Sequence, residues 1–131
     1  RKHKDYEWEI ARFANKLYFN VIGGASKLLK YFERNCNPNT LLSYANRRWS
    51  QGKLYENLGF KFIHNTAPNN FFFKPNENIL YPREMFQKHK LKNILSNFDG
   101  EISAIQNMFN NDYRIIYDSG NKKYVKYYKA R

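Results

Sequence analysis

The feature that most constrains the fold is a helical segment with a glycine pair at its start and a chain-breaking motif at its end. Apolar residues recur at the spacing of one helix face between about residues 25 and 35, with charged residues outside. The motif NPN at residues 37–39 then stops the helix. Gly23 and Gly24 stand directly before it, so we expect a helix entered through a glycine turn.

The segments on both sides of this helix have strand character. Residues 7–14 (EWEIARFA) have a two-residue alternation of side chains, which places Trp8 and Ile10 on one side and Glu7 and Glu9 on the other. We interpret this segment as a strand, with a helix as the alternative at this length. Residues 40–45 (TLLSYA) predict a short buried strand. A strand, a helix and a second strand in this order indicate an α/β fold with at least one parallel crossover.

Further elements follow along the middle of the chain. Ser50 is the predicted N-cap of a helix through Leu58, and Gly59 is its predicted left-handed C-terminal cap. Two strands, KFI at residues 61–63 and NFFFK at residues 70–74, are expected around a turn at Ala67-Pro68-Asn69.

The C-terminal third predicts two helices and a hairpin. The first helix covers residues 82–95, with Pro82 in its first turn, and the second covers about 101–109. Residues 113–128 are interpreted as a hairpin that turns at Asp118-Ser119-Gly120-Asn121. Because no linker is long enough to split the chain, residues 1–131 are predicted to form one domain, with a core at 7–74 and a C-terminal part at 82–131.

The charge balance predicts an acidic partner. The chain has 23 Lys and Arg against 11 Asp and Glu, a net charge of +12, and nucleic acid is the commonest partner of so basic a domain. A solvated basic surface is the alternative. No apolar run is long enough to cross a bilayer, and Cys36 is the one cysteine, so we expect a cytoplasmic protein without membrane insertion or disulfides.

Two clusters are candidate DNA contacts. One follows the 40–45 strand, at the end of a strand where α/β proteins bind ligands: Arg47, Arg48 and Trp49. Arg can bind phosphate and Trp can stack on a base, whereas a surface ion pair and a core Trp are the alternative. The other cluster is the basic set on the predicted 82–95 helix, with a solvated helix face as its alternative: Lys88, His89, Lys90 and Lys92.

The glycine pair has two interpretations. A tight turn with positive φ requires glycine at one position. A phosphate-binding loop also favours glycine, since a side chain would block the backbone amides and a helix N-terminus attracts anions.

The segments NVIGGASKLL and KLYENLGFKFI resemble the second half of the GNAT-type acetyltransferase fold. Asn20, Gly23 and Ala25 fall on that family's phosphate-loop pattern, although Asn20 departs from the usual first residue. The resemblance implies a mixed sheet flanked by helices and a binding loop for coenzyme A or a related donor, made of Asn20, Val21, Ile22, Gly23, Gly24, Ala25 and Ser26. Tyr55 matches the family's general acid, whereas Arg48 and Gln51 replace its usual Asn and Ala.

A second resemblance covers residues 7–125. VIGGASKLLKYF, APNNFFF, FQKHKL and YRIIYDSGN occur in the order found in the C-terminal region of phage homing endonucleases, whose nuclease domain is of the very-short-patch-repair type. Residues 43–56 are also similar to phage Mom-type DNA-modifying proteins. These resemblances imply a duplex-DNA-binding module of a phage protein in a bacterial cytoplasm, lacking the first GNAT strands, with a nuclease domain elsewhere in the full-length protein. The alternative is a transferase that acts on a DNA base.

We predict no metal site within this chain. The resembled nucleases bind a divalent metal with separated Glu, Asp and His residues. His3, His64 and His89 here lie in unlike contexts without ligand spacing, and acidic residues are scattered.

Overall fold

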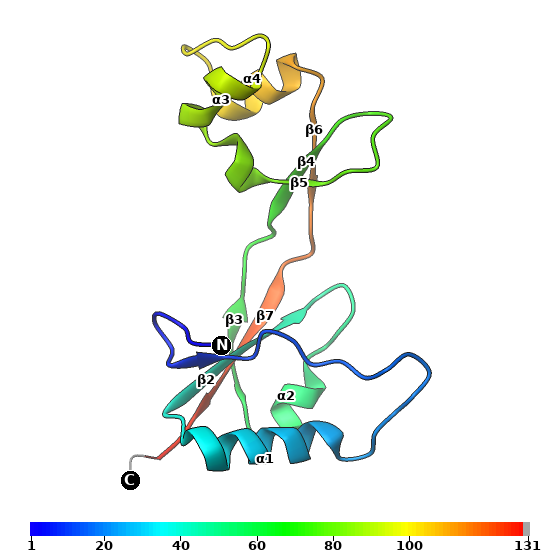
Figure 1. Ribbon diagram of the computed structural model, residues 1–131, viewed down its shortest axis with the longest axis vertical. Coiled ribbons are helices and arrows are strands. Elements are labelled where there is room, and N and C mark those ends of the chain that lie inside the picture. Colours follow the sequence, from blue (N-terminus) through cyan, green and yellow to red (C-terminus); the bar gives the residue numbers. More distant parts are fainter. Residues whose placement is uncertain (130–131) are drawn as a thin grey trace. The chain divides into compact units, whose positions relative to one another are not determined.

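The computed structural model describes residues 1–129 and shows a mixed α/β fold that divides into two compact units (Figure 1). The first unit contains Arg1–Ala67 and the C-terminal segment from Gly120 onward. The inserted unit contains Pro68–Ser119. This division differs from the expected 7–74 and 82–131 parts, because the last strand of the chain belongs with the first unit.

The first unit is built on a four-stranded sheet. Its strands stand in the order β1 (Trp8–Glu9), β2 (Thr40–Asn46), β7 (Asn121–Tyr127) and β3 (Lys61–Asn65). β1 and β2 are parallel, and helix α1 (Gly24–Cys36) connects them, so the predicted crossover, helix and 40–45 strand are confirmed. β7 is antiparallel to both of its neighbours.

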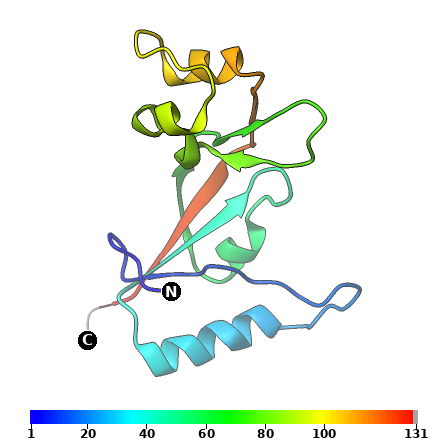
Figure 2. The ribbon, with the colours of Figure 1, turned by 45° about the horizontal axis from the view of Figure 1, so that its top comes forward.

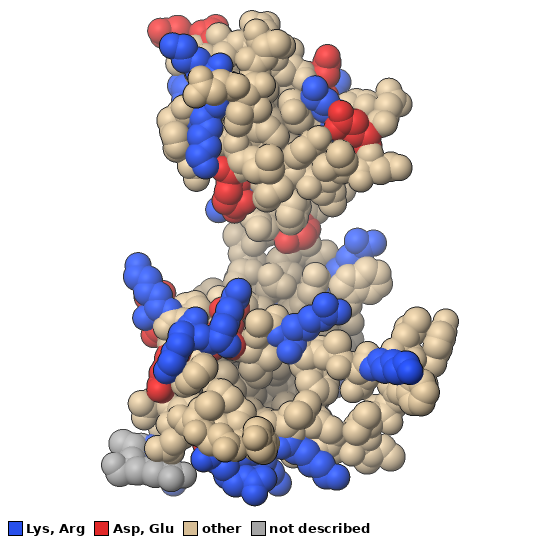
Figure 3. All heavy atoms as spheres, viewed as in Figure 1, with Lys and Arg blue, Asp and Glu red and all other residues tan. Residues whose placement is uncertain are grey.

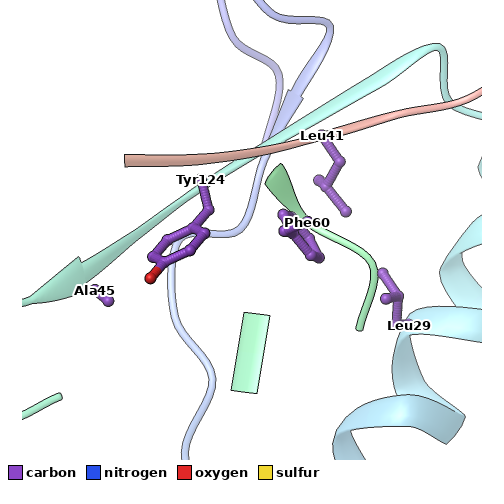
Figure 4. Close-up of a cluster of buried hydrophobic side chains, with 5 residues drawn as sticks. All are labelled: Leu29, Leu41, Ala45, Phe60 and Tyr124. Carbon is purple, nitrogen blue, oxygen red and sulfur yellow. The ribbon is translucent and has the colours of Figure 1, made fainter. Parts of the chain in front are cut away.

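The core of this unit lies on the face of the sheet next to α1. Leu41 and Ala45 of β2 and Tyr124 of β7 pack there with Phe60 and with Leu29 of α1 (Figure 4). The Tyr124 ring is fully buried, and its hydroxyl donates a hydrogen bond to the carbonyl of Gln51 at 3.3 Å.

The first predicted strand is much shorter than residues 7–14. Only Trp8 and Glu9 pair with β2, and the amide of Ile10 donates the last bond, to the carbonyl of Leu42 at 2.9 Å. Beyond this point the chain leaves the sheet and runs as a long loop to α1 (Figure 2). Alternation along 7–14 predicted a strand, but strand geometry persists only where a neighbouring strand supplies hydrogen bonds.

Helix α2 (Lys53–Asn57) ends as predicted. Gly59 has a φ of 88°, in the left-handed region. Its amide donates to the carbonyl of Glu56 at 3.1 Å, and the amide of Phe60 donates to the carbonyl of Tyr55 at 2.9 Å. These two bonds form a Schellman motif, which satisfies carbonyls left open at the helix end.

The predicted start of α2 is wrong. The residue before the helix is Gly52, at a φ of 79°, and Ser50 instead accepts a hydrogen bond from the Gly52 amide at 3.1 Å. Gly52 is needed because it lies against the phenol ring of Tyr124, where a Cβ atom would overlap the ring.

The inserted unit has its own sheet and core. The sheet order is β5 (Tyr81–Pro82), β4 (Asn70–Phe73) and β6 (Arg114–Tyr117), and the helical elements are the 3-10 helix η1 (Arg83–Phe86), α3 (Lys88–Ile94) and α4 (Ala104–Asn110). α4 confirms the second predicted helix with a small shift. The core consists of Phe72, Phe86, Leu91, Leu95 and Met108.

The predicted helix 82–95 is interrupted at Gln87. That residue is extended, with a φ of −65° and a ψ of 140°, and Pro82 lies in β5 instead of a helical turn. Phe86 and Leu91 are both buried in the core. In one continuous helix these side chains would point about 140° apart, so the interruption lets both reach the same cluster.

Neither predicted strand pair forms a hairpin. β3 and β7 belong to the first sheet, whereas β4 and β6 belong to the second, so the segments at 67–69 and 118–121 connect units instead of turning. The two connecting segments are paired with each other. The Thr66 amide donates to the Asn121 carbonyl at 2.7 Å, and the Asn69 amide donates to a carboxylate oxygen of Asp118 at 2.8 Å.

Gly23 and Gly52 provide a matched test of these turns. Both have left-handed φ, but a Cβ atom on Gly23 would meet open space, whereas one on Gly52 would overlap Tyr124. We expect Gly23→Ala to lower the free energy of unfolding by about 1–2 kcal/mol through backbone strain. Gly52→Ala should cost about 1–3 kcal/mol more because it overpacks the core. Urea unfolding measures both, and equal losses would contradict the proposed packing.

Candidate nucleic-acid interface

The net positive charge of the chain comes entirely from the first unit. This unit contains 17 Lys and Arg against 5 Asp and Glu, a balance of +12, whereas the inserted unit contains 6 against 6. Figure 3 shows the basic side chains of the first unit in several groups, including one along α1, while basic and acidic side chains intermix on the inserted unit. An anionic partner is therefore attracted mainly to the first unit.

A row of basic residues follows the outer side of α1. Lys27, Lys30 and Arg34 are exposed and stand at positions i, i+3 and i+7, which share one side of a helix. We call these three residues the α1 basic face. It extends over about 10 Å of helix, and within residues 1–129 none of the three forms an ion pair.

Glu33 stands at the edge of this face and is held by side chains of β7 and of the segment after it. A carboxylate oxygen of Glu33 accepts hydrogen bonds from the Lys126 ammonium and the Tyr128 hydroxyl, each at 2.8 Å. Partial burial raises the pKa of Glu33, but these bonds and the charge of Lys126 outweigh it, so the pKa lies below its ordinary value. Burial and the neighbouring Glu33 raise the pKa of Tyr128, which keeps its hydroxyl protonated as a donor.

The predicted cluster Arg47–Trp49 forms an exposed turn directly after β2. The carbonyl of Asn46 accepts from the amides of Trp49 at 3.1 Å and Ser50 at 2.9 Å, and its side-chain oxygen accepts from the Arg48 amide at 2.9 Å. The Trp49 side chain is not part of the core, since the residue is 76% exposed. The guanidinium carbon of Arg48 lies 4.6 Å from the centroid of a Trp49 ring. This geometry disagrees with the alternative interpretation of a core Trp.

The predicted basic set on α3 lies in the inserted unit. Lys88, His89, Lys90 and Lys92 are all exposed, while Leu91 is buried. On a helix Lys88 and Lys92 share one side and Lys90 points about 160° away from Lys88, so the three lysines cannot all meet one flat surface. The Lys90 ammonium donates to the Glu84 carbonyl at 3.3 Å. The two predicted DNA-contact clusters thus belong to different units.

The predicted phosphate loop combines an exposed segment with an uncapped helix start. Asn20, Val21, Ile22 and Gly23 are exposed, and Gly24, Ala25 and Ser26 are half-buried. Gly23 has a φ of 70°, so a turn requirement accounts for this glycine, and the side of the residue where a Cβ would project is open. α1 has no side-chain cap and no acidic residue in its first turn. The Gly24 amide donates to the Val21 carbonyl at 3.0 Å, so the amides of Ala25 and Ser26 are the ones open to an anion within the described residues.

Tyr55 and the start of α1 meet at one cavity. The cavity has a volume of about 390 Å³ and lies between the segment after β1, α1 and α2. Its walls are mainly apolar and include Ile10, Phe13, Ala25, Leu29, Leu54 and Tyr55. The Tyr55 ring packs 5.4 Å from Phe60 and 5.5 Å from Tyr124, measured between ring centroids. The structure therefore brings Ala25 and Tyr55 together, whereas Gly23 and Gly24 do not line the cavity.

Sequence reasoning did not identify the α1 basic face as a candidate site. Its signal is the i, i+3, i+7 spacing of three basic residues, on the same segment whose apolar residues indicate the helix. Among residues 1–129 no group of three or more His, Cys, Asp or Glu is arranged to hold a metal ion. None of the helices in this part of the chain is long and apolar enough to cross a membrane.

Comparison with known proteins gives no relative for this chain. No protein-family model, no curated protein and no solved structure matches it.

The contribution of the Glu33 charge to the free energy of unfolding can be tested by measuring stability at several pH values. Glu33→Gln removes the charge that holds Lys126, so we expect a loss of about 1–2 kcal/mol in the free energy of unfolding at pH 7. A lowered pKa stabilises the fold above the unfolded value of about 4.3, and this contribution disappears as pH falls through the folded value. The difference between wild type and variant should therefore shrink in acid.

Glu56→Gln is the matched control, because Glu56 is exposed and forms no ion pair within the described residues. Urea unfolding at several pH values measures all three proteins. A Glu33→Gln difference that stays constant down to pH 3 would argue against a charge effect.

Proposed function

We propose that the first unit binds duplex DNA, chiefly through phosphate contacts. The observation that carries this proposal is the confinement of the net charge of +12 to the first unit, where none of the three cations of the α1 basic face forms an ion pair within the described residues. Duplex DNA carries one negative charge per roughly 1.7 Å of axis, so a straight row of cations can neutralise several phosphates together.

The resemblance to the C-terminal region of phage homing endonucleases supports the same proposal. In such a protein this chain would hold the duplex while a nuclease domain in the same full-length protein cuts it. The Arg47–Trp49 turn belongs to the same unit as α1 and adds two exposed guanidinium groups to its positive charge. α3 is a second possible contact, but it lies in a unit without net charge.

Salt titration tests the phosphate contacts. Replacing Lys27, Lys30 and Arg34 together by Ala should lower the slope of log affinity against log salt by roughly 2 to 3, since each lost phosphate contact removes about 0.9. Binding to two unrelated duplexes should weaken alike, because phosphate contacts carry no sequence information. An unchanged slope would contradict the assignment to α1.

The matched control replaces Lys88, Lys90 and Lys92 by Ala. It removes the same charge from α3, and we expect a smaller change of slope because these lysines do not share one side of the helix. A larger effect from the α3 variant than from the α1 variant would instead favour the prediction made from the sequence. Absence of DNA binding by the wild-type chain at low salt would refute the proposed function itself.

A second candidate function is group transfer from coenzyme A or a related donor, with a DNA base as one conceivable acceptor. The specific observation in its favour is the shared cavity of Ala25 and Tyr55 beside the uncapped start of α1. In a GNAT-like arrangement the α1 amides would bind the pyrophosphate, the apolar walls would hold the arm of the donor, and the Tyr55 hydroxyl would return a proton to the leaving thiolate.

Calorimetry with coenzyme A tests this candidate. We expect Tyr55→Phe to lower turnover with little change in donor affinity, because it removes only the phenolic hydroxyl. Tyr31→Phe is the control, since Tyr31 is exposed on α1 and does not line the cavity. Failure of the wild-type chain to bind coenzyme A would refute the transferase candidate and leave the DNA proposal unaffected.

A further inference from the structure

We infer that the Arg47–Trp49 turn is a base-stacking site, so that the protein binds DNA containing an unpaired base more tightly than an uninterrupted duplex. This inference rests on the proposed function and adds the form of DNA that is recognised. It concerns stacking on the indole of Trp49, which is distinct from the phosphate contacts of α1.

The exposure of Trp49 is the first argument. The chain has two tryptophans, and the fold uses only one of them for packing. Trp8 is half-buried, and its ring lies 5.3 Å from that of Phe32 in an edge-to-face contact. Trp49 contributes to neither core cluster and is 76% exposed. Folding thus leaves a large flat apolar surface in water, where a ligand can cover it.

The rigidity of the turn is the second argument. Three hydrogen bonds to Asn46 fix the backbone of residues 48–50, and the amide of Arg47 donates to the carbonyl of Gly120 at 3.1 Å. The backbone that carries Trp49 is therefore ordered before any ligand arrives. A preorganised contact loses less conformational entropy on binding than a mobile one, which favours a binding role for the ring.

The surroundings of the ring select the ligand. Arg48 covers one ring surface and brings a positive charge, and Arg47 adds another without an ion-pair partner in the described chain. A cationic ligand is repelled there, whereas an anion with a flat aromatic group is attracted. A nucleotide has both properties, since its base can stack on indole while its phosphate meets guanidinium.

The same surroundings predict little selectivity among the four bases. The ring stands on an exposed turn, and Trp49 lines neither of the pockets formed at the two ends of α1. Stacking uses the π-face that every base offers, whereas selection of one base needs hydrogen bonds to its edge. We therefore assign a preference for unpaired bases of any sequence.

The experiment compares an intact duplex with the same duplex carrying one extra unpaired 2-aminopurine. We expect wild type to bind the second substrate roughly 5- to 100-fold more tightly, the range that one stacked base contributes. Binding should also quench 2-aminopurine fluorescence, which reports stacking directly. Trp49→Phe should keep most of the preference, because it retains an aromatic ring.

Trp49→Leu is the matched control, since it keeps an apolar side chain and removes the aromatic face. It should abolish both the preference for the unpaired base and the quenching, because an aliphatic side chain offers no π-face on which a base can stack. A preference that survives Trp49→Leu, or equal wild-type affinity for both substrates, would overturn this inference and leave the proposed function standing. Absence of binding to either substrate would overturn both.

Discussion

The first unit depends on the pairing of β7 with strands that are distant in sequence. β7 stands between β2 and β3 and supplies the hydrogen-bond ladder of both. Its alternating side chains also serve the two faces of the sheet, with Tyr124 in the core next to α1 and Val125 buried on the opposite face. Without β7, β3 would lose the partner that places it in the sheet, and the core would lose its largest fully buried side chain.

The same strand positions the functional surface. Tyr124 restricts the start of α2 to a glycine, and Lys126 of β7 joins Tyr128 in holding Glu33 of α1. Leu29 and Phe32 pack the inner side of α1 on the core, and Glu33 is held at the edge of the helix, so the outer side is free to carry basic residues. Such an excess of one charge opposes folding through self-repulsion, and the first unit has three ion pairs in its described part to offset it. A surface of this kind is consistent with a partner that supplies the missing negative charge.

Local signals predicted the elements of the first unit well and their partners poorly. The helix after Gly23, the 40–45 strand and the left-handed Gly59 follow from periodicity and backbone preference, which act within a few residues. The membership of β3 and β4 in different sheets follows from contacts across the chain, and the short apolar runs at 62–63 and 71–73 fit either arrangement. The interruption of the predicted helix at Gln87 also depends on distant contacts. It follows from the burial of Phe86 and Leu91 in one core cluster, which the local sequence does not indicate.

The candidate site likewise has some features that follow from local sequence and others that depend on distant contacts. Arg47, Arg48 and Trp49 were found because they follow a strand, and their exposure agrees with a surface role. The cavity that joins Ala25 to Tyr55 depends on how α1 and α2 pack on the sheet. The difference in net charge between the two units is visible only once their boundaries are known. These boundaries lie in the two segments that the sequence predicts as turns.

The insertion between β3 and β7 bears on the order of events during synthesis. Pro68–Ser119 leaves the ribosome before β7, so the inserted unit can fold while the first sheet still lacks one of its two inner strands. Once it folds, the bond between Asn69 and Asp118 holds its two ends together. β3 and β7 then begin to pair from neighbouring ends, and the loop-closure entropy of the intervening segment has already been lost. The inserted unit thereby connects the antiparallel strands β3 and β7, as a turn connects the two strands of a hairpin.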